Sequence, residues 1–136
     1  MNNLYARAVF FVENGEKAQR FYVDKLGFSE EWAYKEDGQV YVCQVSLFGF
    51  ELILNQTSER SRSRAGLGRV FIGLEEDQVE TLHRHIGAHC IPHERVDWGR
   101  PTLVIRDLDG NELFFWDQPT EGQQQLELNE DTAATP

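Results

Sequence analysis

Histidine imidazoles are the first side chains in this sequence to test for metal chemistry, because all four lie within 11 residues. They are His83, His85, His89 and His93. The first two fall two residues apart in the last turn of a predicted helix, and therefore on different faces, where a cationic side chain complements the helix C-terminus. The other two fall on one face of the strand predicted to follow, separated by roughly 13 Å of rise. This spacing argues against a shared ion.

Patterns for other catalytic chemistry are missing from the sequence. There is no nucleophile elbow, Ser-His-Asp order, P-loop or dinucleotide fingerprint. The turn DLDGN, residues 107–111, superficially suggests a calcium loop, but it lacks the further acidic positions and the distal glutamate, so we expect a hairpin. Cys43 and Cys90 sit in apolar surroundings without motif spacing, which predicts buried free thiols and neither a disulfide nor a redox pair.

The predicted strands and helices occur in the same order in the two halves of the chain. Each half starts with a strand, over 7–12 or 69–74, and continues into a helix with apolar residues at helical spacing. We expect Asn14 to cap the first helix, and Gly27 and Gly87 to end the two helices. Three strands are predicted after each helix, over 30–35, 39–47 and 50–55 in the first half and over 89–96, 101–106 and 112–117 in the second.

The pattern therefore predicts an α+β fold made of two βαβββ modules, over about 6–56 and 69–117. With 136 residues, 40% of them hydrophobic, the chain is long enough for one packed domain, which we expect over 1–117. The segment 57–68 between the modules is rich in serine and carries three arginines. It is typical of a mobile linker, and a basic flap over a pocket is the functional alternative.

The net charge of −10 works against a nucleic-acid partner and mildly favours cationic ligands. Part of it comes from residues 118–136, a polar segment with four acidic residues and no lysine or arginine, which is typical of a disordered extension. No apolar run is long enough for a membrane span, and the first residues lack the pattern of a signal peptide. We therefore expect a cytoplasmic protein without membrane contact.

Two segments carry a resemblance to a known family. They are VENGEKAQRFYVDKLGF, residues 12–28, and DWGRPTLVIRDLDGNELFFW, residues 97–116. Through them, residues 7–117 resemble the vicinal oxygen chelate superfamily of glyoxalases, bleomycin-resistance proteins and extradiol dioxygenases, and most of all its bleomycin-resistance branch. The chain departs from the motif at Leu108, where the family usually has proline. The resemblance implies a curved mixed sheet with a cleft, and commonly a homodimer in which both chains line each cleft.

The resemblance also locates the positions at which metal-dependent members bind an ion, typically with two histidines and two glutamates. These positions correspond here to Arg7, Glu51, Arg69 and Phe114. One carboxylate cannot hold a divalent ion, and two guanidiniums would repel it, so we expect no metal and no cofactor. We expect Glu51 to pair with Arg7, Arg69 or both. Either this ion-pair cluster is purely structural, or one arginine remains available to an anionic group of a ligand.

Aromatic side chains are the other candidates for ligand contacts, because sequestering members of the family hold flat, often cationic drugs between aromatic rings. Trp98 resembles the family's Trp-Gly element beside the groove, with a turn tryptophan that covers the core edge as the alternative. Trp32 and Tyr34 alternate on one predicted strand, and Phe114 and Trp116 share a face of the last strand. These two pairs either line the cleft or pack the sheet.

The function that the resemblance implies, taken with these residues, is that of a non-enzymatic, antibiotic-resistance type of protein that sequesters an aromatic drug-like molecule in the cleft of a homodimer, with bleomycin as the leading candidate. Two alternatives stay open: a metal-dependent lyase or dioxygenase whose ligands lie elsewhere, and a structural module without a ligand. The acidic surface suits a cationic drug, whereas two arginines in the cleft suit an acidic ligand. The predicted binding residues are Arg7, Trp32, Glu51, Arg69, Trp98 and Phe114.

Overall fold

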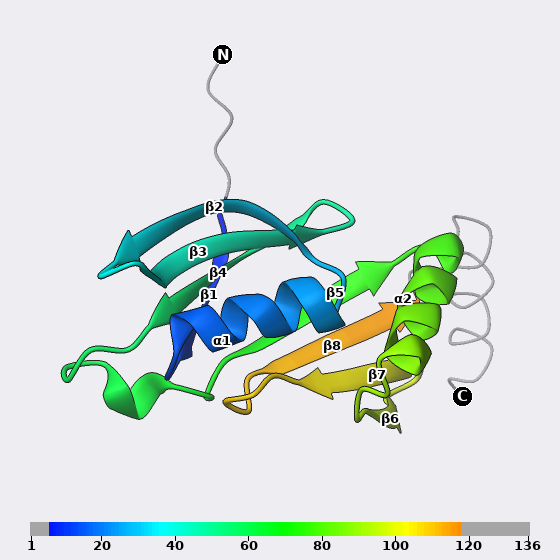
Figure 1. Cartoon of the computed structure of the whole chain (residues 1–136). Coiled ribbons are helices and arrows are strands. Elements are labelled where there is room, and N and C mark those ends of the chain that lie inside the picture. The colour runs from blue at the N-terminus through cyan, green and yellow to red at the C-terminus, as the bar shows by residue number, and fades with distance from the viewer. Residues whose placement is uncertain (1–5, 118–136) are drawn as a thin grey trace, which may run out of the picture.

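The computed structural model describes residues 6–117, so the predicted acidic tail lies outside the described residues. Its first half consists of β1 (Ala8–Val12), α1 (Gly15–Arg20), the π-helical turn η1 (Phe21–Lys25), β2 (Ser29–Glu36), β3 (Gln39–Leu47) and β4 (Phe50–Gln56). A 3-10 helix, η2 (Arg62–Arg64), lies in the linker, and the second half consists of β5 (Arg69–Leu74), α2 (Glu76–Ala88), β6 (Glu94–Asp97), β7 (Pro101–Arg106) and β8 (Glu112–Asp117). The predicted α+β fold of two βαβββ modules is confirmed (Figure 1).

The two modules have the same sheet topology. The strand orders are β1-β4-β3-β2 and β5-β8-β7-β6, and in each sheet the first strand runs parallel to the last while the other neighbours are antiparallel. Figure 1 shows the modules side by side, with α2 at one end of the second sheet. Because the pairings match, corresponding residues of the two modules lie on corresponding sheet faces.

One face of each sheet is buried in a common core. In β1 and β4, Phe10 and Leu54 point into this core, as do Ile72 and Leu113 in the second sheet. The helix α1 packs on β3 and β4, and Leu82 of α2 belongs to the same buried cluster. Alternation along the strands then places the predicted binding residues of the strands on the opposite faces, away from this core.

The turn between β7 and β8 ties the two modules together. The hydroxyl of Tyr22 donates to Asp107 over 2.8 Å, and the side-chain amide of Asn111 donates to the carbonyl of Phe11 over 3.0 Å. Burial, and next to it the Asp107 carboxylate, raise the pKa of Tyr22 well above its usual value. Asp107 also accepts the backbone N–H groups of Asp109 and Asn111. Both carboxylate oxygens of Asp107 thus accept hydrogen bonds from other residues of the protein, and the predicted hairpin is confirmed.

The first helix begins as predicted, with Asn14 accepting the N–H of Lys17 over 2.9 Å. The chain bends after this helix at Gly27, whose φ of 82° is readily available only to glycine.

No helix within residues 6–117 is long and apolar enough to cross a membrane.

The second module differs from the prediction between residues 87 and 93. The helix α2 runs through Gly87 and ends at its C-cap His89, and β6 begins only at Glu94, so the predicted strand over 89–96 is wrong in its first half. The N–H of Ile91 still bonds to the carbonyl of Ile86, which extends the helical turn beyond α2. Cys90 is consequently exposed in a turn with a φ of 51°; both thiols are free, but only Cys43 is buried.

Candidate functional site

Four aromatic side chains gather on the outer face of the second sheet. Phe71 and Phe114 are register partners on β5 and β8, and their rings stack with centroids 4.7 Å apart and planes 10° apart. Trp98, in the turn between β6 and β7, stacks on Phe114 at 5.4 Å and on Phe71 at 6.0 Å. Trp116 meets Phe71 edge-on at 5.2 Å. We call these four residues the aromatic platform.

The aromatic platform is partly open to solvent. Trp98 is 58% exposed and Phe71 40% exposed, whereas Phe114 is only 3% exposed and forms the base on which they rest. These ring contacts fix Trp98 and Phe71 before any ligand arrives, so little side-chain entropy is lost when another ring stacks on them. The platform therefore offers a preformed surface for a flat, apolar molecule.

Charged residues border the aromatic platform on one side. The guanidinium carbon of Arg69 lies 4.7 Å from the centroid of the Phe114 ring, within the range of a cation–π contact. Arg69 also donates to Glu112 over 3.0 Å, because the two are register partners on β5 and β8. Arg106 bonds to the other oxygen of Glu112 at 3.0 Å and to Glu94 at 2.6 Å. The four alternating charges hold Arg69 at the edge of the platform.

The outer face of the first sheet carries a row of polar contacts. Arg7 forms an ion pair with Glu51 at 2.6 Å. The side-chain amide of Gln44 donates to the same carboxylate over 3.4 Å, and the indole N–H of Trp32 donates to Gln44 over 3.1 Å. We call Arg7, Glu51, Gln44 and Trp32 the polar row. It crosses the sheet from the start of β1 to β2 and ends in an indole that is 44% exposed.

The linker also reaches the first module. The guanidinium carbon of Arg64, in η2, lies 5.7 Å from the centroid of the Phe11 ring on β1. Alternation places Phe11 on the same side of β1 as Val9, whose side chain is 44% exposed. This contact is compatible with the basic flap considered for the linker, which stays a prediction.

The six predicted binding residues fall into two groups of three. Arg7, Glu51 and Trp32 belong to the polar row, whereas Arg69, Phe114 and Trp98 meet at the second sheet. The expected pair of Arg7 and Glu51 is present, but Arg69 pairs with Glu112, since that carboxylate is its neighbour within its own sheet. Trp98 is 58% exposed and its ring stacks on the buried Phe114. Its assignment to a ligand site stays a prediction, beside the alternative of a turn tryptophan that covers the core edge.

Sequence reasoning missed two members of the site, Phe71 and Gln44. Phe71 lies two residues after Arg69 on the same strand, so strict alternation would have placed both on one face. Gln44 is 5% exposed within the apolar strand β3, and a polar residue inside such a strand signals a side-chain partner. For Phe71 the signal was the spacing along the strand, and for Gln44 it was the polar residue type within an apolar strand.

The four positions that the resemblance assigns to metal ligands do not fit an ion here. Glu51 is engaged by Arg7, Arg69 by Glu112, and Phe114 has no donor atom. Within residues 6–117, no group of three or more histidine, cysteine, aspartate or glutamate side chains could hold an ion.

The rings of His85 and His89 lie 4.4 Å apart at the end of α2, which corrects the expectation that His89 sits on a strand.

Comparison with known proteins agrees with this architecture. The model of the glyoxalase/bleomycin resistance protein/dioxygenase superfamily matches residues 5–115. A bleomycin-binding protein from Streptomyces verticillus, solved with copper(II)-bleomycin, is similar at 17% identity and a TM-score of 0.65, covering 88% of this chain and 99% of its own. A lactoylglutathione lyase from Agrobacterium tumefaciens is similar at 18% identity and a TM-score of 0.60, covering 85% and 94%.

An antibiotic-binding protein from a Streptomyces species is 19% identical with a TM-score of 0.60, and the match covers 88% of this chain and all of that protein. No curated protein sequence matches the chain. At these identities the structural likeness speaks for the fold, and the family match covers nearly all of the described residues. The chain therefore belongs to the glyoxalase/bleomycin resistance protein/dioxygenase superfamily.

Proposed function

We propose that the protein binds a flat, aromatic, drug-like molecule without covalent chemistry and without a metal. The observation that carries the proposal is the stack of Phe71 and Trp98 on the buried Phe114 ring, with the first two exposed to solvent. A ring that stacks on Trp98 gains apolar contact with side chains that are already ordered.

The charged residues beside the aromatic platform favour ligands with particular polar substituents. Arg69 keeps its guanidinium over Phe114, so an acidic or hydrogen-bond-accepting substituent of the ligand can meet it at the platform edge. Glu94, at the far end of the ion-pair chain, has a side chain that is 49% exposed and offers a matching contact for a basic substituent. The site thus suits an aromatic ligand with polar groups at its rim.

We also propose that the protein forms a homodimer, in which each outer sheet face contacts the second copy. The outer face of the first sheet exposes Val9, Trp32 and Tyr34, and that of the second exposes Phe71 and Trp98. Apolar side chains gathered in this way are typical of an interaction surface. If the first sheet of one copy covers the second sheet of the other, a two-fold arrangement closes both sites at once and brings the polar row over the aromatic platform.

The fold is compatible with this function. Proteins that share it include one solved with copper(II)-bleomycin and one described as antibiotic-binding. The lyase that also shares the fold is not favoured here as a model, because Arg7, Arg69 and Phe114 replace the residues that a metal site requires. Bleomycin itself is the first ligand to test.

A melting-temperature screen tests the binding proposal. The protein is heated with bleomycin, other cationic glycopeptides, aromatic acids and thiol conjugates, and a binder raises the melting temperature because it stabilises the folded state. We expect at least one compound to raise the melting temperature of the wild type and of Leu67→Ala, but not that of Trp98→Ala. Leu67 is a matched control, since it is apolar, 77% exposed and outside the platform. Equal shifts in all three proteins would place the ligand elsewhere.

The dimer is tested separately by light scattering after size exclusion. We expect about twice the chain mass of 15.7 kDa, and a shift toward the monomer when Trp98 is replaced by lysine. A monomer at every concentration would contradict the dimer while leaving the aromatic platform to be judged by the melting-temperature screen.

A further inference from the structure

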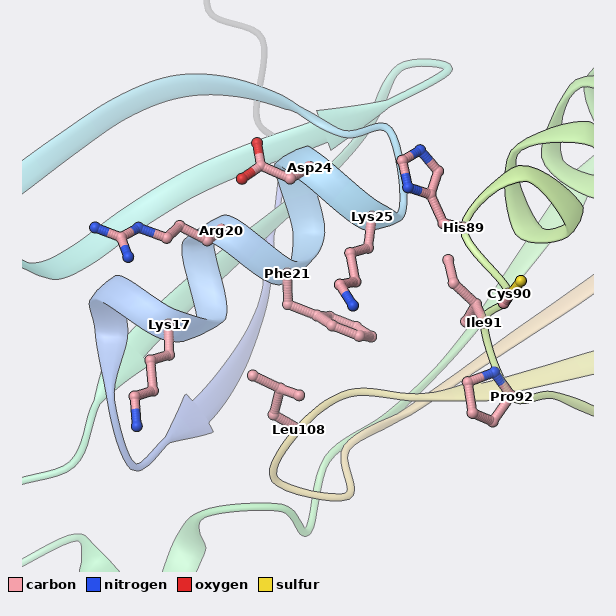
Figure 2. Close-up of a pocket in the computed structure, with 10 residues that line it drawn as sticks. All are labelled: Lys17, Arg20, Phe21, Asp24, Lys25, His89, Cys90, Ile91, Pro92 and Leu108. Carbon is pink, nitrogen blue, oxygen red and sulfur yellow. The ribbon is translucent and has the colours of Figure 1, made fainter.

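A pocket of about 420 Å³ lies between the two modules and shares no residue with the aromatic platform or the polar row. One side is formed by α1 and η1, and the other by the segment that follows α2 together with Leu108 of the β7–β8 turn (Figure 2). Its volume falls in the range of small-molecule sites, which is roughly 300–1,000 Å³. The pocket exists because β6 starts late, so residues 89–92 form a turn facing the first helix.

The pocket is lined mainly by apolar surface. Phe21, Ile91, Pro92 and Leu108 contribute to this lining, and Figure 2 shows the Phe21 ring directed toward the 91–92 segment with Leu108 beneath it. Leu108 is 62% exposed although it is a large aliphatic residue in a turn. An exposed leucine beside a half-buried phenylalanine leaves apolar area that a ligand chain or ring would cover.

The charges around the pocket are predominantly positive. Lys17, Arg20 and Lys25 line it together with a single acidic residue, Asp24. This local excess of two positive charges occurs in a chain whose net charge is −10. In Figure 2 the Lys25 side chain extends over the apolar part beside the Phe21 ring, whereas Arg20 and Asp24 point outward. Lys25 is thus the cation best placed to meet a bound group.

We infer that this pocket binds a small amphipathic anion, with an apolar chain or ring against Phe21, Ile91 and Leu108 and a carboxylate or similar acid at Lys25. An apolar floor with a cation at its edge discriminates against neutral and cationic molecules of the same shape. Lys17, at the other end of the pocket, adds to the positive potential that attracts such a ligand. The inference is independent of the function proposed for the aromatic platform.

The protein contains a built-in reporter for occupancy of this pocket. Cys90 lies in its wall and is exposed, whereas the other thiol, Cys43, is buried and has a pKa raised to about 12 by burial. A neutral alkylating reagent such as iodoacetamide should therefore modify the native protein at Cys90 alone. A molecule bound in the pocket would shield this thiol and slow the reaction.

The experiment measures the rate of Cys90 alkylation by mass spectrometry with increasing decanoate, kept below the concentration at which it forms micelles. We expect saturable protection by decanoate and much weaker protection by decyltrimethylammonium, which has the same chain and the opposite charge. Each protein is compared with itself without ligand, so that a change in intrinsic thiol reactivity cancels.

Two variants test the assignment of the two parts of the pocket. Lys25→Glu should weaken the protection about tenfold, because it replaces attraction by repulsion at the acid group. Lys35→Glu makes the same charge change on β2, outside the pocket. In this variant decanoate should protect Cys90 as well as it does in the wild type. Leu108→Ser, an exposed substitution that leaves the charges in place, should also weaken protection.

Three results would overturn the inference. They are no protection by decanoate, equal protection by the cationic analogue, and equal affinities in the two charge variants. None of these outcomes bears on the melting-temperature screen, because Trp98 and Cys90 report on different surfaces of the molecule.

Discussion

Among the aromatic residues within 6–117, Trp98 is the one that two rings hold while more than half of its surface stays in solvent. Arg69 is held in a similar way, because Glu112 bonds its guanidinium while the Phe114 ring lies under it. Side chains fixed in this manner lose little freedom when a ligand binds, so their contacts contribute more of their energy to affinity. At the scale of residues, binding is expected to depend on these two side chains.

Replacing Arg69 by alanine should weaken binding of an aromatic ligand about fivefold, because the cation that borders the platform is lost. Calorimetric titration with the strongest ligand of the melting-temperature screen measures this change. The control is Arg84→Ala, since Arg84 is an exposed arginine on α2 that donates a hydrogen bond to Thr81 of the same helix. An unchanged affinity in Arg69→Ala would show that Arg69 stabilises the sheet through its ion pair and does not contact the ligand.

Cys43 allows a prediction about pH. Burial, followed by the nearby carboxylates of Glu30 and Glu16, raises the pKa of this thiol to about 12 in the folded protein, whereas in an unfolded chain the thiol loses its proton near the usual pKa of 9.0. Between these values the unfolded state binds fewer protons than the folded state, so the free energy of unfolding falls as the pH rises from about 9 toward 12.

The variant Cys43→Ala removes this contribution. We therefore expect the free energy of unfolding, measured by urea denaturation between pH 8 and pH 11, to fall less steeply with pH in the variant than in the wild type. The raised pKa of Tyr22 acts in the same direction in both proteins and leaves the difference intact. Parallel curves would contradict a raised pKa for Cys43.

At the scale of elements, the end of the linker and the β7–β8 turn form one joint between the modules. The N–H of Gly66 donates to the carbonyl of Phe11, and the side chain of Asp109 accepts the N–H of Glu13. A Cβ atom built at Gly66 would overlap the carbonyl oxygen of Asp109. The close approach of these backbones explains why this position holds glycine.

The variant Gly66→Ala should destabilise the fold, by about 2 kcal/mol or more, because it adds this overlap to the strain of a positive φ. Gly38→Ala is a matched control, since Gly38 has nearly the same φ and no atom within 4 Å of a built Cβ. The difference between the two free energies of unfolding, measured in urea, isolates the contact at the joint. Equal losses would mean that only backbone strain matters at Gly66.

The elements also show which features the sequence could predict. Alternation together with the turn residues predicted every strand except β6 to within one residue at either end, and Asn14 identified the start of α1. The segment 89–93 was misassigned, because its apolar residues suit a strand although the backbone bond from Ile91 to Ile86 continues the helical turn. The partner of Arg69 could not be predicted either, since that pairing depends on the register of β5 against β8.

In the molecule as a whole, the two outer sheet faces differ in their chemistry. The second sheet carries stacked rings with a charged border, and the first carries a polar row that ends in an exposed indole. In the proposed homodimer, a ligand would lie between the aromatic platform of one copy and the polar row of the other, and would contact an apolar surface on one side and a polar surface on the other. Sequence reasoning found three residues of each face but could not divide them between the faces, because the division follows from the separate pairing of the two sheets.

We propose above all that the aromatic platform binds a ligand without a metal. Calorimetric titration of the strongest screened ligand into protein dialysed against a chelator, for the wild type and Trp98→Ala, tests this proposal. We predict the same affinity with and without chelator, and a loss of about tenfold or more in Trp98→Ala. Binding that disappears with the chelator and returns with a divalent ion, or that Trp98→Ala retains unchanged, would contradict the claim.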